Sequence, residues 1–218
     1  MRARSCQSRR RGIAVIEFTF ALLFLVPLLL GTFVFGFRLI RALQMDQIVR
    51  DLGHMYIRGV DFRNSGPQQN AQTLAQSFNL SSTGTSLLIF SQIRVEQQSD
   101  CDSANPSRPA GTPCTNLGNP VFVEQVRVGN TGLLINGSTA HSVYGTPPLQ
   151  SDKTVSATDQ ANTASAAAGI TTPTSGFASV ITLQTGEIAY LVEMFNATPD
   201  LNVPGFSGSP QVYAKAIF

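Results

Sequence analysis

The chain has 218 residues, of which 43% are hydrophobic and only 13% are charged. Its formal net charge of +2 depends on five arginines that precede the first apolar run, and removing their charge leaves −3 for the rest. The sequence therefore has no basic face for nucleic acid. Its residues beyond the first forty are enough for one modest domain outside a membrane.

A long apolar run dominates the N-terminal part of the chain. The range Phe18–Phe37 has twenty residues and no charge, and a helix of that length covers about 30 Å, the hydrocarbon thickness of a bilayer. The arginines that stand before it, Arg9, Arg10 and Arg11 above all, predict a cytoplasmic N-terminus with the bulk of the chain across the membrane. We therefore expect a single-pass membrane protein.

Several kinds of N-terminal segment could begin in this way. A cleaved signal peptide has an apolar region of roughly 7–15 residues and a small-x-small site after it. Here the run is longer, and Phe35–Leu39 is a poor site. A lipoprotein needs a cysteine just after the run, whereas Cys6 precedes it. A retained helix remains, either a plain signal anchor or a helix that is cut on its cytoplasmic side.

Glu17 and Gly12 bear on that choice. A carboxylate inside a membrane costs about 2.5–3.5 kcal/mol on insertion scales, so it normally has a partner or reaches water at the interface. A cut after Gly12 would create a free amine on Ile13, with Glu17 as the fifth residue of the mature chain. The new cation and the carboxylate could then pair within one subunit or between neighbours.

The N-terminal block also has an order of residues that is typical of one family. It contains Gly12, four residues, Glu17-Phe18, an apolar stretch with Pro27, then Gly31 and Gly36-Phe37-Arg38. This block, about a fifth of the chain, resembles the TadE-like minor pseudopilins of the tight-adherence (Flp pilus) secretion system. Phe18 stands where major Flp pilins usually carry Tyr, and Val34 stands where many relatives carry an acidic residue. The aromatic residue and the length of the chain favour a minor subunit.

The resemblance implies a function in assembly. A prepilin peptidase would cut between Gly12 and Ile13, while Glu17 and Phe18 would set the register of the subunit. Pro27 is expected to bend the helix, and Gly31 and Gly36 to permit close helix approach. The implied partners are the bacterial inner membrane, the prepilin peptidase, other pilin or pseudopilin subunits and the pilus assembly platform. The C-terminal domain would be periplasmic, or associated with the pilus after processing.

Two other functions remain as alternatives. The first is an unprocessed, signal-anchored periplasmic interaction domain. The second is a membrane-anchored enzyme, for which the sequence offers only the scattered carboxylates Glu96, Glu124, Glu187 and Glu193; a pair among them stays open. The sequence has no H-E-x-x-H, G-x-S-x-G or Walker-type motif. We therefore predict neither catalytic residues nor a cofactor or metal.

The helix is expected to continue beyond the membrane. Apolar residues recur at three- and four-residue spacings as far as Tyr56, which predicts one helix over 13–59, after a basic leader over 1–12. The apolar positions are Leu39, Leu43, Ile48, Val49, Leu52, Met55 and Tyr56. A second, short helix is predicted over 68–79, with Ala71, Leu74, Ala75 and Phe78 on one face.

The domain over 60–218 changes to a strand pattern. Residues 87–96 and 121–128 are rich in β-branched and aromatic residues, and 186–196 and 211–218 form a second such pair. A long helix packed on an antiparallel sheet of about four strands, an α+β fold, would bury one face of that sheet. Residues 136–176 are mostly Ser, Thr, Ala, Gly and Pro, so we expect a flexible loop or, alternatively, a partner-binding loop.

Two cysteines lie between the first two predicted strands. In an exported domain, Cys101 and Cys114 predict a disulfide that closes a short polar loop. A two-thiol metal or redox site is the alternative, but no histidine lies near in the sequence and the spacing is not C-x-x-C.

Overall fold

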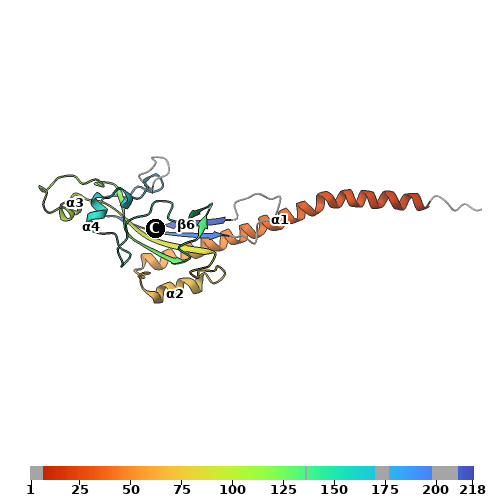
Figure 1. The fold of residues 1–218 in the computed structure, drawn as a ribbon, viewed down its shortest axis with the longest axis horizontal. Helices are drawn as coiled ribbons and strands as arrows, with labels where there is room; N and C mark the ends of the chain where they lie inside the picture. Colours follow the sequence, from red (N-terminus) through yellow and green to blue (C-terminus); the bar gives the residue numbers. More distant parts are fainter. Residues whose placement is uncertain (1–6, 136, 170–176, 198–210) are drawn as a thin grey trace, which may run out of the picture.

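The computed structural model of this chain describes residues 7–135, 137–169, 177–197 and 211–218, with side chains from Ala14 onward. In this part of the chain, one long helix carries a small α+β domain on its C-terminal half, while its N-terminal half extends away from the domain (Figure 1). The predicted fold class, a long helix packed on a four-stranded antiparallel sheet, is confirmed.

The long helix α1 runs from Gln7 to Ile57 and has 51 residues. It begins before the predicted residue 13, so residues 7–12 of the predicted leader are helical, and residues 1–6 lie outside the described part. The helix ends where Gly59 adopts a φ of 84°. The Gly59 amide donates to the Tyr56 carbonyl and the Val60 amide to the Met55 carbonyl, the bond pattern of a glycine-terminated helix.

Only the C-terminal half of α1 packs against the domain. Its buried side chains follow the helical spacing and are Met45, Ile48, Val49, Leu52 and Tyr56. Leu39 and Leu43 are exposed, although they continue the same apolar pattern in the sequence. The buried face of the helix therefore begins at Met45.

The main sheet has four antiparallel strands in the order β2-β1-β5-β6. These are β1 (Ser86–Val95), β2 (Pro120–Gly129), β5 (Ile188–Ala197) and β6 (Gln211–Ile217). All four predicted strands are present, and β1 and β2 form the predicted hairpin. A second sheet contains only β3 (Leu134–Ile135) and β4 (Ser138–Thr139).

One face of the main sheet packs against the helices. Leu88, Phe90, Val126, Val192 and Met194 form a buried core with α1. The Phe62 and Phe90 rings stack with 4.0 Å between centroids, and the Tyr56 ring meets both edge-on. Helix α2 (Ser65–Leu74) lies beside this core (Figure 1). It begins and ends earlier than the predicted range of 68–79; Ala71, Ala75 and Phe78 are buried, whereas Leu74 is exposed.

The opposite face of the sheet is covered by the segment for which we expect a flexible loop. Over residues 137–169 that prediction is wrong. Tyr144, Val155, Ala166 and Ala168 are buried there against Ile93, Phe122, Leu191 and Phe177. Alanine loses no side-chain entropy on burial, so this composition can still pack. Residues 136 and 170–176 lie outside the described part.

Backbone hydrogen bonds fix this segment to the edge strand β2. The Val155 amide donates to the Val123 carbonyl, the Gln125 amide to the Lys153 carbonyl and the Ala168 amide to the Pro120 carbonyl, at 2.8–3.0 Å. The segment contains α4 (Ala157–Asn162) and the 3-10 turn η1 (Ala164–Ala166); the turn η2 (Phe177–Ser179) follows it. The same bonds pair backbone N–H and C=O groups along the outer edge of β2, which would otherwise be unpaired.

The predicted disulfide between Cys101 and Cys114 is present, with 5.4 Å between the Cα atoms. It joins α3 (Gln98–Ala104) to the chain that returns to β2. Helices α3 and α4 lie at the end of the molecule farthest from the N-terminal half of α1 (Figure 1).

Candidate functional site

The exposed half of α1 is the first candidate site. Among the described residues, this is the one helix long and apolar enough to cross a membrane; its most apolar stretch has a mean hydropathy of 2.4, and none of that stretch is buried. In water, such a surface would be costly, because exposed apolar patches of this extent mark interaction or membrane surfaces. The finding is compatible with single-pass membrane anchoring.

The predicted processing and register residues lie on this half. Glu17 and Phe18 are exposed and lie five and six residues after Gly12. At 1.5 Å per residue, Glu17 lies about 7.5 Å along the axis from Gly12. Gly12 and Ile13 belong to α1, as do the three consecutive arginines Arg9, Arg10 and Arg11, but their side chains are not described.

Two shallow apolar grooves follow the surface of this half. The first has a volume of 230 Å³ and is lined by Ile16, Thr19, Phe20 and Leu23. The second has a volume of 340 Å³ and is lined by Leu25, Leu28, Leu29, Thr32 and Phe33. Such three- and four-residue spacings make the grooves into which the ridges of a second helix fit.

Small residues at these grooves leave room for close packing. The hydroxyls of Thr19 and Thr32 donate to the carbonyls of Val15 and Leu28, each at 2.8 Å, so both are satisfied within the helix. A Cβ on Gly36 would meet no atom within 4 Å, so that surface is open to a neighbour. Gly31 lies one turn before it, and Pro27 lies inside the helix. This half is therefore suited to helix–helix contact in a membrane.

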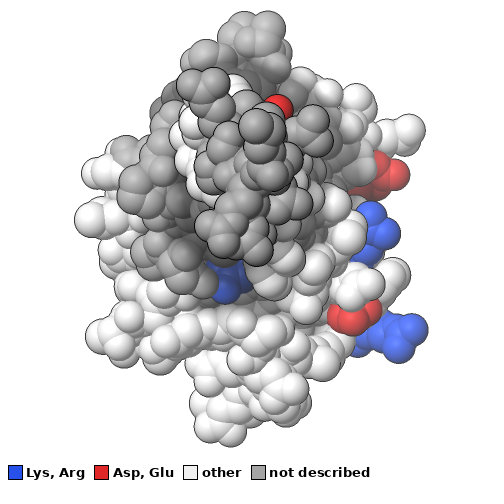
Figure 2. Space-filling model, turned by 90° about the vertical axis from the view of Figure 1, so that its right-hand side faces the viewer, with Lys and Arg blue, Asp and Glu red and all other residues white. Residues whose placement is uncertain are grey.

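The domain surface that looks along α1 toward its N-terminus has few charges. Figure 2 shows this face, where the described surface consists mostly of residues other than Lys, Arg, Asp and Glu. A surface of low charge is compatible with an approach to lipid head groups or to neighbouring subunits. Within the described part of this face, Lys and Arg do not form the cluster that binds anionic lipid strongly.

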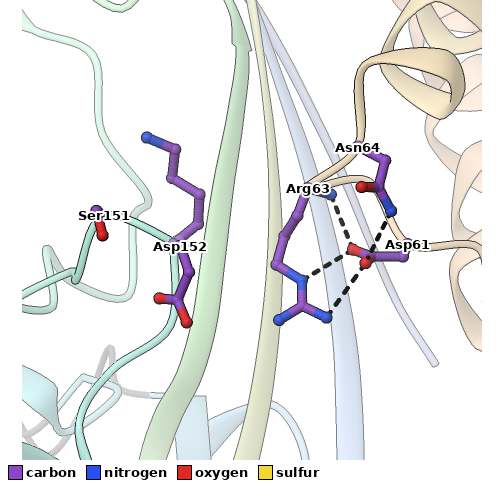
Figure 3. Close-up of a pocket in the computed structure, with 6 residues that line it drawn as sticks. Asp61, Arg63, Asn64, Ser151 and Asp152 are labelled. Carbon is purple, nitrogen blue, oxygen red and sulfur yellow. Dashed lines mark hydrogen bonds and ion pairs between the residues drawn. The ribbon is translucent and has the colours of Figure 1, made fainter.

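A polar cleft is the second candidate site. It has a volume of 260 Å³ and is lined by Asp61, Arg63 and Asn64 on one side and by Ser151, Asp152 and Lys153 on the other (Figure 3). The first three residues follow α1, and the other three belong to the segment that covers the far face of the sheet. Two carboxylates and two cations give it a balanced charge.

Three charged groups of this cleft, Asp61, Arg63 and Asp152, are already engaged. The Arg63 Nε donates to Asp61 Oδ1 at 2.9 Å, and Asn64 donates to Asp61 Oδ2 at 3.0 Å. Hydrogen bonds from Arg63 lower the pKa of the Asp61 carboxyl, and those from Thr154 lower the pKa of Asp152. Both carboxylates therefore stay ionised and bound at neutral pH.

The four carboxylates that the sequence singles out lie in different surroundings. Tyr56 donates a hydrogen bond to Glu124 on the helix face of the sheet, where Arg63 Nε lies 3.6 Å away. Glu193 is buried on the other face and accepts hydrogen bonds from Tyr213 at 2.8 Å and from the Val143 amide at 3.1 Å. Glu187 is exposed and accepts from the Gln184 amide. Glu124 and Glu193 are thus not a catalytic pair.

Burial sets the acid–base state of these groups. It raises the pKa of the Glu193 carboxyl, and together with Glu124 it raises the pKa of the Tyr56 hydroxyl. Tyr56 therefore remains a hydrogen-bond donor. Glu124 binds Tyr56 of α1 on one face of the sheet, and Glu193 binds the Val143 amide on the other face. Both carboxylates thus make structural contacts that hold a covering segment on the sheet.

The fourth carboxylate, Glu96, lies beside the disulfide. Among the described residues, Glu96, Cys101 and Cys114 are the one group of three potential metal ligands close together. The two sulfur atoms are bonded to each other, so the disulfide alternative, and not the two-thiol metal site, describes this structure. Sequence analysis missed the contact with Glu96, although Glu96 stands only five residues before Cys101.

No protein-family model matches the sequence, and searches of curated proteins and of solved structures found no significant match. Functional inference therefore rests on the residues and their geometry.

Proposed function

We propose that this chain is a TadE-like minor pseudopilin that is processed by a prepilin peptidase and takes part in assembly of a tight-adherence (Flp-type) pilus. The observation that carries the proposal is the division of one continuous helix, α1. Its C-terminal half is the packing partner of the sheet, whereas its N-terminal half is bare, apolar and carries Glu17 five residues after Gly12.

The bare half needs an apolar environment that the domain does not supply. A bilayer supplies it first, and the helices of other subunits supply it after assembly. Glu17 is costly in either setting unless it meets a cation. A cut between Gly12 and Ile13 would create such a cation, the Ile13 amine, about one helical turn from Glu17. Pairing between neighbouring subunits would then fix their axial register.

In this proposal the N-terminus starts in the cytoplasm, the helix spans the inner membrane and the domain lies in the periplasm. Arg9, Arg10 and Arg11 hold that orientation. The grooves around Thr19 and Thr32 receive helices of other pilin or pseudopilin subunits or of the assembly platform. The low charge of the face in Figure 2 supports close approach to the membrane or to neighbours. The proposal assigns no enzymatic activity to the chain.

The decisive experiment is the intact mass of the protein from cells with and without the prepilin peptidase. We expect a mature N-terminus at Ile13 in the first case and the complete leader in the second. A Gly12→Leu variant is the matched control and should keep its leader in both. An intact leader in wild-type cells contradicts the proposal and favours an unprocessed, signal-anchored interaction domain.

A second prediction concerns Glu17→Ala. The variant should insert into the membrane at the wild-type level, because removal of a charge makes the helix more apolar. Assembly should fall by at least about tenfold, since loss of a paired buried charge leaves its partner uncompensated at a cost of several kcal/mol. Cysteine cross-linking between subunits measures assembly, with Glu187→Ala, an exposed carboxylate of the domain, as control. Wild-type cross-linking in Glu17→Ala would show that Glu17 does not set the register.

A further inference from the structure

The disulfide and a carboxylate form a compact, buried cluster at the distal end of the domain. The sulfur atoms of Cys101 and Cys114 and a carboxylate oxygen of Glu96 all lie within 4.8 Å of one another. Cys101 and Glu96 are each 1% exposed and Cys114 is 7% exposed. Ala161 of α4 and the partly buried Ala104 and Leu117 complete the apolar wall around the sulfur atoms.

The Glu96 carboxylate makes one weak ion pair and no hydrogen bond within the described residues. Neither of its oxygens has a hydrogen-bond partner within the described residues, although both are buried. Its nearest cation is Arg94, whose Nη2 lies 3.7 Å from Oε2. Arg94 also binds Asp100 at 3.3 Å and Gln160 at 3.0 Å, so it neutralises Glu96 only in part. A buried carboxylate without hydrogen bonds is unfavourable, and its position calls for a reason.

The backbone around Glu96 holds it at the base of the disulfide loop. Its amide donates to the Asn119 carbonyl, and its own carbonyl accepts from the Gly118 amide, so it joins both ends of the loop. The charged groups that act on it are Arg94 from its own strand and Asp100 from α3. From α4, Asp159 is bound instead to Ser156 and Thr163. Burial is the main cause that raises the pKa of Glu96 to about 7.

We propose that Glu96 is the proton acceptor for closure of the Cys101–Cys114 disulfide by a thiol–disulfide oxidant. A thiolate, and not a thiol, attacks a disulfide, and a buried thiol loses its proton with difficulty. A neighbouring carboxylate removes that obstacle. The inference concerns oxidation of the exported domain and does not depend on the pilus proposal.

The reaction proceeds in two exchanges. The Cys114 thiol, the more exposed of the two, loses its proton to water. Its thiolate attacks the oxidant RSSR, forms a mixed disulfide and releases RS⁻, which takes up a proton from water. The Cys101 thiol then gives its proton to the Glu96 carboxylate, and its thiolate attacks the Cys114 sulfur. The bond between Cys114 and the oxidant sulfur breaks, and a second RS⁻ leaves and takes up a proton from Glu96. Two cysteine thiols have lost two electrons, and RSSR has become two RSH.

The test measures the rate of disulfide closure against pH. The full chain in detergent micelles, with Cys6→Ser in every variant, is reduced, transferred to oxidised glutathione and quenched with iodoacetamide, and mass spectrometry counts the free thiols. Glu96→Gln should close at least about tenfold more slowly than the parent near pH 7, which is less than the roughly 10²–10⁴-fold that a fully ionised, positioned base contributes. The two rates should converge above about pH 9, where solvent alone ionises the thiols. Glu187→Gln is the matched control and should follow the parent.

Two outcomes would overturn the proposal. One is a Glu96→Gln profile that coincides with the parent at every pH, which would leave Glu96 a merely buried residue. The other comes from the parent itself, which remains informative even if Glu96→Gln does not fold. Its rate should rise through a first inflection near pH 7, the pKa of Glu96, before the thiols ionise. A single inflection at the thiol pKa of about 8.5 contradicts a role for Glu96.

Discussion

At Glu96, the burial of one side chain links the stability of the domain to pH. Its pKa is raised from the ordinary 4.5 to about 7, so the native state holds this proton more tightly than the unfolded chain does. This contribution is fully present below pH 4.5 and is lost as the pH rises to about 7. We therefore predict that the melting temperature of the parent falls as the pH rises from 4.5 to about 7, and that Glu96→Gln removes the part of this fall that Glu96 causes. Thermal unfolding with the disulfide intact measures it.

The difference between parent and variant isolates Glu96 from other titrating groups, including Glu193, whose pKa is also raised by burial. Glu187→Gln, at an exposed carboxylate, should leave the pH profile of the parent unchanged. If Glu96→Gln and the parent keep a constant difference in melting temperature across this range, Glu96 is ionised throughout and the prediction is wrong.

At the scale of elements, the contact between α1 and β6 depends on a glycine. A Cβ added to Gly53 would lie 2.0 Å from the ring of Phe218, which follows β6. Two backbone hydrogen bonds with Tyr190, each 3.0 Å, hold the backbone of Phe218 in place, so its ring can make room only by leaving its present side-chain conformation. We predict that Gly53→Ala lowers the free energy of unfolding by about 1–2 kcal/mol, because overpacking outweighs the better helix propensity of alanine. Chemical denaturation measures the loss.

A double-mutant cycle separates this clash from any other effect of the substitution. In a Phe218→Ala background the ring is gone, so Gly53→Ala should be neutral or stabilising by up to about 1 kcal/mol. An equal loss in both backgrounds would show that Phe218 is not the obstacle, and would place the cost within α1 itself.

The sequence predicts the helices and strands of this fold better than it predicts the contacts between them. The helix, the four strands and the disulfide follow from periodicity, β-branched residues and cysteine number, all of which are local signals. Two features depend on tertiary packing and leave no such signal. Residues 137–169 pack through alanines and backbone bonds, although their composition suggests a loop. Glu96 meets the disulfide only because the loop folds back to Gly118 and Asn119.

At the scale of the whole molecule, the two halves of α1 make separable contributions. Residues 14–30 are exposed throughout, so they add no packing to the domain. We predict that a chain of residues 38–218 folds in water with its disulfide and the melting temperature of the full chain in detergent, to within about 2 °C, a shift that less than about 1 kcal/mol would produce. A chain of residues 52–218 is the contrasting variant, because it loses the buried Met45, Ile48 and Val49 and should not fold. Circular dichroism and light scattering distinguish the two. If the chain of residues 38–218 unfolds or aggregates as readily as the shorter one, the N-terminal half of α1 stabilises the domain.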